Sequence, residues 1–291
     1  TLGLGAMALS TLVQAKGTAP KSSSLGIEPG TSGLPLFAAK AKRVIFLCMA
    51  GGPSHLELLD HKPKLKELHG SELPDSIRQG QRLTGMTSGQ KNFPVAASKF
   101  KFAQHGQCGM WLSEMLPHTA KIADDICVLR SMHTGHNGHE VSIRYFHGGI
   151  AGITGRPTMG SWIVYGLGSE ADNLPAYMIL SDPGGHPVDG THNWSSGFMP
   201  ASYQGTLFRP VGTPILDLAV PADLGPAGQR RQLDLLAALN DEHLKSRPGG
   251  TELAARAASY ELAWRMQSEA PEAVDLAQET PATLAAYGVD A

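Results

Sequence analysis

Three histidines and a glutamate within residues 133–140 form the densest group of possible metal ligands in the chain. They are His133, His136, His139 and Glu140, with glycines between them at positions 135 and 138, and His147 follows one short helix later. Residues at steps of three drift around a regular helix, so the glycines favour a loop in which these side chains can converge. Imidazole and carboxylate groups bind divalent metals. The pattern predicts a metal or catalytic site, and the alternative is a set of packing histidines.

A second group of possible ligands follows the Gly-Gly-Pro at positions 51–53. It contains His55, Glu57 and Asp60. The glycines allow a tight turn and a close approach of the backbone to a ligand. We expect divalent-metal ligation here, and the alternative is a turn whose polar side chains simply face solvent.

A third and weaker group lies in the stretch that begins with Asp-Pro-Gly-Gly at positions 182–185. It contains Asp182, His186, Asp189 and His192. These residue types can also bind a metal or transfer protons. The alternative is a plain loop, since Gly and Pro are typical of turns.

A short apolar run precedes each of these three groups. The runs cover residues 43–50, 126–130 and 176–180 and are apolar on both faces. Such runs are typical of buried parallel strands. Because sites in open α/β sheets lie beyond the carboxyl ends of the strands, we expect the polar groups to lie at these strand ends.

Helical patterns alternate with these strands, which predicts an α/β domain with a largely parallel sheet. One helix is expected to begin at Ser113, a suitable N-cap, and another covers residues 160–168. Stronger patterns at 228–247 and 251–269 are separated by Pro-Gly-Gly and predict a helical hairpin over 228–270. We expect this hairpin to form a cap or an insertion on the α/β core.

The composition limits the classes of function. The chain has 291 residues, a formal net charge of −2 and 42 % apolar residues. A near-neutral chain lacks the excess of Lys and Arg that nonspecific nucleic-acid binding needs, so we expect no nucleic-acid partner. The apolar share is sufficient for a core, which argues against general disorder. The sequence has no GxGxxG, Walker A, HExxH or GxSxG motif.

Residues 1–15 are apolar and carry no charge, and Val13-Gln14-Ala15 fits a loose small-x-small cleavage site. They are interpreted as the end of an export signal, and residues 16–40, rich in Lys, Ser, Gly and Pro, as a linker. The alternative for the first segment is an ordinary N-terminal helix. The run is too short for a membrane span. We therefore expect an exported protein, periplasmic or extracellular, with no span in the mature chain.

Cys48, Cys108 and Cys127 are odd in number and form no CxxC pair. Cys48 and Cys127 lie in apolar runs, and we expect them to be buried thiols. The expectation of export therefore rests on the signal and not on a disulfide framework.

Five segments carry a likeness to a known family. They are residues 51–63 (GGPSHLELLDHKP), 131–134 (SMHT) with His139-Glu140, 159–168 (MGSWIVYGLG), 260–267 (YELAWRMQ) and 287–288 (YG). Together they resemble the exported family named domain of unknown function 1501, or DUF1501. The resemblance extends from the signal remnant to residue 291, so it covers nearly the whole chain.

The resemblance implies a fold and a class of activity. DUF1501 is usually grouped with the alkaline phosphatase and sulfatase superfamily, and its members typically carry twin-arginine export signals. This grouping implies an alkaline phosphatase-like α/β sandwich, with a largely parallel sheet between helices and a metal site at strand ends. Residues 41–291 would be its N-terminal part, with further metal-site residues in a C-terminal half that follows. A divalent metal, either Zn, Ca or Mg, would activate a nucleophile and hold a phosphate or sulfate ester.

The sequence departs from the superfamily pattern at two places. The first strand of the superfamily normally ends in a metal-binding Asp, whereas the nearest carboxylates here are Glu57 and Asp60. A sulfatase carries a Cys or Ser nucleophile, whereas the loop at 136–140 has neither, and Thr134 and Ser142 are the only hydroxyls close by. The standard covalent route therefore lacks its usual nucleophile.

The first hypothesis is an exported metal-dependent hydrolase that acts on a small-molecule or glycan sulfate or phosphate ester. Thr134 is its candidate nucleophile, and Glu140 is expected to orient a ligand histidine through a hydrogen bond. The alternatives are a non-catalytic exported binding protein on the same fold and an inactive fragment that lacks half of the site. The candidate metal ligands are His55, Asp60, His133, His136 and His139.

Overall fold

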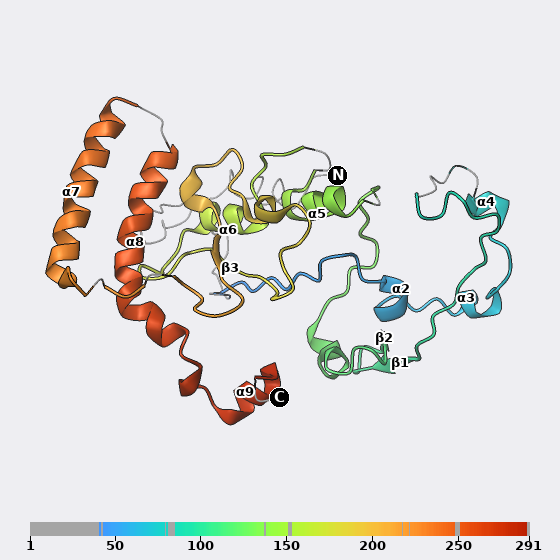
Figure 1. Cartoon of the computed structure of the whole chain (residues 1–291). Coiled ribbons are helices and arrows are strands. Elements are labelled where there is room, and N and C mark those ends of the chain that lie inside the picture. Colours follow the sequence, from blue (N-terminus) through green and yellow to red (C-terminus); the bar gives the residue numbers. More distant parts are fainter. Residues whose placement is uncertain are drawn as a thin grey trace, which may run out of the picture. The chain divides into compact units, whose positions relative to one another are not determined.

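The computed structural model describes most of the chain from residue 41 onward (Figure 1). The export signal expected at 1–15 and the linker expected at 16–40 lie outside the described residues. The described residues divide into two compact units, which we call the hairpin unit, within Leu47–His139, and the helical unit, within Glu140–Ala291 together with residues 41 and 43–46. The described residues are 41, 43–78, 80, 85–136, 138–150, 153–216, 218–220, 222–247 and 251–289.

The hairpin unit contains an antiparallel pair of strands. Strands β1 (Phe102–His105) and β2 (Met110–Ser113) pair so that the first residue of β1 lies opposite the last residue of β2. The Asp124 carboxylate holds the turn between them, because it accepts hydrogen bonds from the backbone N–H of Gln107 at 2.9 Å and of Cys108 at 2.8 Å. The other elements are the helices α2 (His55–Leu58), α3 (Lys64–Glu67) and α4 (Asp75–Arg78) and the 3₁₀ helix η1 (Thr119–Asp125).

The helical unit contains the longer helices and a parallel pair of strands. Strand β3 (Met178–Leu180) pairs in parallel with β4 (Thr206–Phe208). The connection between them includes the 3₁₀ helices η2 (Gly190–Trp194) and η3 (Ala201–Tyr203). The remaining elements are α5 (His139–Gly148), α6 (Met159–Leu167), α7 (Gly225–Lys245), α8 (Thr251–Ala273), η4 (Leu276–Gln278) and α9 (Pro281–Tyr287).

Local sequence signals set both ends of helix α9. The Thr280 side chain accepts a hydrogen bond from the backbone N–H of Thr283, which satisfies one of the free donors of the first turn. Pro281 occupies the first helical position, where a missing N–H costs nothing. Gly288 ends the helix with a φ of +69°, a conformation that glycine adopts without strain.

Two small clusters of buried side chains hold the helical unit together. In the first, Val164 of α6 packs with Met199 and Tyr203. In the second, Phe208 of β4 packs with Met266 of α8. The second cluster therefore anchors the long helix α8 to the strand pair.

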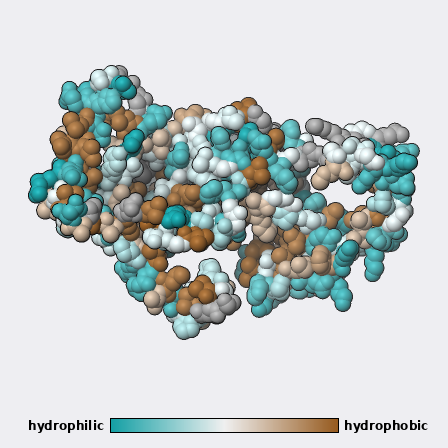
Figure 2. Space-filling model, viewed as in Figure 1, coloured by the Kyte–Doolittle hydropathy of each residue, from teal (hydrophilic) through white to brown (hydrophobic). Residues whose placement is uncertain are grey.

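Helices α7 and α8 lie side by side as a hairpin (Figure 1). Arg230 of α7 donates to both carboxylate oxygens of Glu261 in α8, at 2.9 and 2.7 Å. Helix α7 also exposes Leu235, Leu236 and Leu239, and hydrophobic surface is visible along it in Figure 2. No helix of the described residues combines the length and the apolar character that a membrane span requires.

The predicted mixture of helices and strands is confirmed, but two of the three predicted strands are wrong. Residues 43–50 and 126–130 contain no strand, and Ile45 and Leu47 are 83 % and 87 % exposed. An apolar, β-prone run becomes a strand only where a neighbouring strand pairs with its backbone, and neither run has such a neighbour in the described part of the chain. Of the third run, Met178–Leu180 forms β3.

The predicted helices at 160–168, 228–247 and 251–269 are confirmed as α6, α7 and α8. The helix expected to begin at Ser113 is wrong, because this residue ends β2 and is buried by the strand pairing. The thiols of Cys48 and Cys127, expected to be buried, are exposed, since the runs that carry them join no sheet in the part of the chain that the structure describes. The described sheets have two strands each. The alkaline phosphatase-like sandwich with a largely parallel sheet therefore stays a prediction.

Candidate functional site

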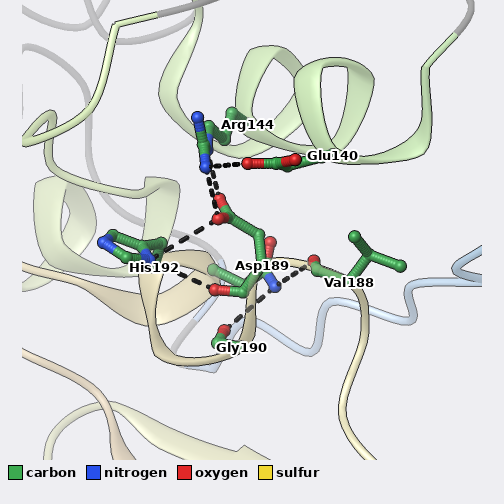
Figure 3. Close-up of polar contacts among 7 residues, drawn as sticks. Glu140, Arg144, Val188, Asp189, Gly190 and His192 are labelled. Atoms are coloured by element: carbon green, nitrogen blue, oxygen red, sulfur yellow. Dashed lines mark hydrogen bonds and ion pairs between the residues drawn. The ribbon is translucent and has the colours of Figure 1, made fainter.

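Charged side chains gather around Asp189 in the helical unit (Figure 3). The Asp189 side chain is only 5 % exposed. Arg144 of α5 donates to both of its oxygens, from Nε to Oδ2 at 2.5 Å and from Nη2 to Oδ1 at 2.6 Å. Nη2 of Arg144 also donates to Oε1 of Glu140, and Nδ1 of His192 lies 3.5 Å from Oδ1 of Asp189. We call these four residues the Asp189 cluster.

Helix α5 positions the first half of the cluster. Glu140 lies in its first turn and Arg144 four residues later, so the two side chains share one face. A carboxylate in the first turn also interacts favourably with the positive end of the helix dipole. The Arg144 side chain is 20 % exposed and that of Glu140 is 55 % exposed. The guanidinium is therefore shielded on the side of Asp189 and open toward water on the side of Glu140.

The loop between β3 and β4 positions the second half. Asp189 has a φ of +83° and is the one non-glycine residue with a positive φ among the described residues. The Asn193 side chain, 5 % exposed as a residue, braces this turn: its Nδ2 donates to the carbonyl oxygens of Val188 at 3.1 Å and Gly190 at 3.0 Å. Strained backbone that the surroundings hold in place recurs at functional sites.

His192 is the part of the cluster that faces water, with a side chain 56 % exposed. Its Nδ1 lies 3.2 Å from the Asp189 carbonyl oxygen and 3.5 Å from Oδ1 of the same residue. Both neighbours are acceptors, so the proton of a neutral imidazole belongs on Nδ1. The lone pair is then on Nε2, which is the arrangement of a general base.

The charges of the cluster are unequal. Hydrogen bonds from Arg144 hold the pKa of the Asp189 carboxyl below its ordinary value, against the opposing effect of burial. The same contact raises the pKa of Arg144. The two carboxylates and the one guanidinium of the cluster sum to a formal charge of −1. Asp189 therefore stays ionised at neutral pH and can stabilise a protonated His192.

The other polar residues of this loop have structural contacts. Asp182 accepts a hydrogen bond from the backbone N–H of Gly184 at 2.7 Å, which closes a turn directly after β3. His186 lies edge-on to the ring of Trp194, with ring centroids 5.6 Å apart. Of the third group predicted from the sequence, the structure thus brings together Asp189 and His192.

The residues of the other two predicted groups are engaged separately. His55 begins α2, and Asp60 forms an ion pair with Lys62 at 3.0 Å. In the loop before α5, the Thr134 hydroxyl donates to the carbonyl oxygen of His136 at 2.8 Å and accepts from its N–H at 3.2 Å. The candidate nucleophile therefore closes a local turn. Glu140, expected to orient a ligand histidine, is hydrogen-bonded to Arg144.

A divalent metal requires several ligand side chains around one point. His133, His136 and His139 are exposed, and the described residues contain no group of three or more His, Cys, Asp or Glu side chains placed to hold one ion. Metal sites in proteins need three or four such ligands at about 2.0–2.3 Å. The structure does not assemble the predicted ligands His55, Asp60, His133, His136 and His139 into a ready site. The metal stays a prediction.

Sequence reasoning missed two residues of this site, Arg144 and Asn193. Arg144 has one local signal, the spacing of four residues from Glu140 that is typical of a helical ion pair. Its more important partner, Asp189, lies 45 residues away, and no local pattern connects them. Asn193 braces a turn that the sequence does not define.

Comparison with known proteins places the chain in a family. A family model described as "Protein of unknown function (DUF1501)" matches residues 41–291. No curated protein and no solved structure matches the chain. The match includes every described residue of both units, among them the Asp189 cluster. The chain belongs to the DUF1501 family.

Proposed function

We propose that this protein is an exported hydrolase of sulfate or phosphate esters in which His192 is the general base. The geometry of His192 against Asp189 carries the proposal. The ester class, the export and an alkaline phosphatase-like sandwich are supported by the sequence resemblance alone. The substrate would be a small molecule or a glycan that carries the ester.

The chemistry assigned to the cluster is proton transfer. His192 Nε2 takes a proton from water while the water oxygen bonds to the sulfur or phosphorus atom. Asp189 stabilises the imidazolium that forms, as an ionised carboxylate beside Nδ1–H does. The bond from sulfur or phosphorus to the ester oxygen then breaks, the leaving alkoxide takes a proton from water on the opposite side, and the imidazolium releases its proton to solvent. The products are the alcohol and inorganic sulfate or phosphate.

The net charge of the cluster links the ester class to the predicted metal. A charge of −1 repels a sulfate or phosphate ester, since like charges near a protein surface cost about 1–4 kcal/mol at 4 Å. An anionic ester therefore needs a cation at this site. We propose a divalent metal, Zn, Ca or Mg, as that cation, and its ligands stay unassigned because the described residues form no group of three.

A non-catalytic binding protein is the second candidate. The turn made by Thr134 favours it, because the hydroxyl predicted as nucleophile is already hydrogen-bonded to His136 in both directions. On this alternative the Asp189 cluster would be a structural ion pair. An ester would then bind without turnover.

The test is hydrolysis of 4-nitrophenyl sulfate and 4-nitrophenyl phosphate by the full chain, with and without added Zn, Ca or Mg. We expect His192→Asn to lower kcat by about 10²–10⁴-fold, the usual contribution of a general base. His243→Asn is the matched control, since His243 is exposed on α7. Equal rates for the His192 and His243 variants, or no turnover by the natural protein under any metal condition, would overturn the proposal. Binding of either ester without turnover would support the binding-protein alternative.

A further inference from the structure

We infer that Arg144 is a positioning residue that fixes the orientation and the tautomer of His192 through the Asp189 carboxylate. The consequence for catalysis rests on the proposed function, but the inference about the histidine stands on geometry. Arg144 acts on His192 through the Asp189 carboxylate, which it holds by two hydrogen bonds and which lies beside the imidazole.

The first step is the fork between Arg144 and Asp189. Two parallel hydrogen bonds, from Nε to Oδ2 and from Nη2 to Oδ1, fix the plane of the carboxylate as well as its position. Oδ1 is also the oxygen that lies 3.5 Å from His192 Nδ1. One carboxylate oxygen therefore joins the guanidinium to the imidazole.

The second step is the backbone of the turn. The Asp189 carbonyl oxygen faces His192 twice, since it accepts from the backbone N–H at 3.2 Å and lies 3.2 Å from the ring Nδ1. The buried Asn193 side chain donates hydrogen bonds to the carbonyl groups of Val188 and Gly190, which flank Asp189 in the sequence. His192 is thus held between a carbonyl and a carboxylate, both of which select Nδ1–H.

Loss of Arg144 would remove the partner that holds the Asp189 carboxylate in place beside His192. A carboxylate with 5 % exposure and no counter-charge is unfavourable, so Asp189 would turn toward water or become protonated. His192 would keep the carbonyl contact and lose the carboxylate. The Nε2–H tautomer, which free histidine side chains prefer in water, would then gain population, and that form has no lone pair on the exposed nitrogen.

The experiment is a long-range ¹H–¹⁵N correlation spectrum of the full chain with ¹⁵N-labelled histidine. It is recorded at about pH 8.5, roughly two units above the ordinary histidine pKa of about 6.5, so that exposed imidazoles are neutral. The signal of His192 is assigned by its loss in His192→Asn. We expect the natural protein to show His192 with the proton on Nδ1, and Arg144→Gln to shift the population toward Nε2–H.

Arg230→Gln is the matched control. Arg230 donates through Nη1 and Nη2 to both oxygens of Glu261 and pairs with Asp234 four residues later, and none of these residues belongs to the Asp189 cluster. It should leave the His192 tautomer unchanged. Arg144→Lys keeps the charge and loses the fork, so an intermediate population is expected; it replaces Arg144→Gln in the test if circular dichroism shows that the glutamine variant does not fold.

An unchanged His192 tautomer in Arg144→Gln, or an equal change in Arg230→Gln, would overturn the inference. Where an ester is hydrolysed, Arg144→Gln should also lower kcat by about 10–100-fold, as loss of a residue that supports a catalytic group does. The spectra need no substrate. A protein that shows the expected tautomers and hydrolyses neither ester would contradict the proposed function and leave the role of Arg144 intact.

Discussion

Arg144 and Asp189 lie 45 positions apart in the sequence and form a forked ion pair that joins helix α5 to the loop between β3 and β4. The Asp189 carboxylate is almost fully buried, and the Arg144 guanidinium replaces water as its hydrogen-bond donor. Bidentate pairs of this kind are stronger than exposed ones because they combine charge with fixed geometry. The pair is thus a stabilising contact as well as the support of His192.

We expect Asp189→Asn to lower the free energy of unfolding by about 2 kcal/mol, within the usual range for a hydrogen bond to a charged group. Asparagine tolerates a positive φ, so the loss reports the missing charge and not the backbone at +83°. Urea unfolding followed by circular dichroism measures it. The pKa of Asp189 is below its ordinary value when folded, so the contribution is complete above the ordinary carboxyl range and disappears as the pH falls through the folded pKa.

Asp234→Asn is the control for this prediction. Asp234 pairs with Arg230 at 2.9 Å, but its side chain is 65 % exposed. Exposed pairs contribute about 0.2–1 kcal/mol, so its loss should be the smaller of the two. An equal decrease in the free energy of unfolding for the two variants would contradict the claim that the buried Asp189 pair contributes more stability than the exposed Asp234 pair.

The pH dependence of stability should depend on His147. Burial lowers its pKa, because the imidazole lies half-buried against the rings of Phe46 and Phe146, with centroids 5.6 and 5.5 Å away. The unfolded chain therefore binds this proton at a higher pH than the folded chain. Stability from this group is complete above its ordinary value of about 6.5 and is lost as the pH falls from there through the folded pKa.

His147→Phe keeps an aromatic ring and removes the titration. We expect the free energy of unfolding of this variant to fall less than that of the natural protein between about pH 7 and pH 5, a window that spans the ordinary histidine value. Parallel curves for the natural protein and His147→Phe would show that the buried imidazole has no part in the slope.

The elements that sequence reasoning predicted correctly are those with local signals. In α8, Leu253, Ala257, Tyr260 and Trp264 recur at steps of three and four residues, and a Pro-Gly-Gly separates this helix from α7. Both signals are local to these segments. Strands differ, since their hydrogen bonds come from segments elsewhere in the chain. Residues 43–50 have the composition of a strand but no partner among the described residues, whereas Met178–Leu180 has one in Thr206–Phe208.

In the candidate site, too, the features with local sequence signals could be predicted and the contacts between distant segments could not. Asp189 and His192 could be predicted as polar residues after an apolar run, because this pattern is local. Their pairing with Arg144 could not, since it depends on how α5 meets a loop 45 residues away. The larger histidine group at 133–140 gave the stronger pattern, yet its members are exposed and do not gather among the described residues. The metal site expected in that group stays a prediction.

Gly160 gives a test of how tightly α6 is packed. It lies at the start of this helix, and the ring of Tyr177 rests directly on it, so that a Cβ at this position would lie 2.3 Å from the ring atoms Cε2 and Cζ. Gly160→Ala must displace the ring or the helix. Overpacking of this kind costs about 1–3 kcal/mol. We expect a lower urea midpoint, although alanine favours helix more than glycine does.

Gly148→Ala, at the end of α5, separates packing from helix propensity. A Cβ there would lie 3.6 Å from the nearest atom, on Arg156, which is an ordinary contact. This variant should be as stable as the natural protein or up to about 1 kcal/mol more stable, through propensity alone. If Gly160→Ala were stabilised to the same degree, the contact of Tyr177 with α6 would not exist in solution. A fall confined to Gly160→Ala would show that only glycine allows the ring to lie against the first turn of α6.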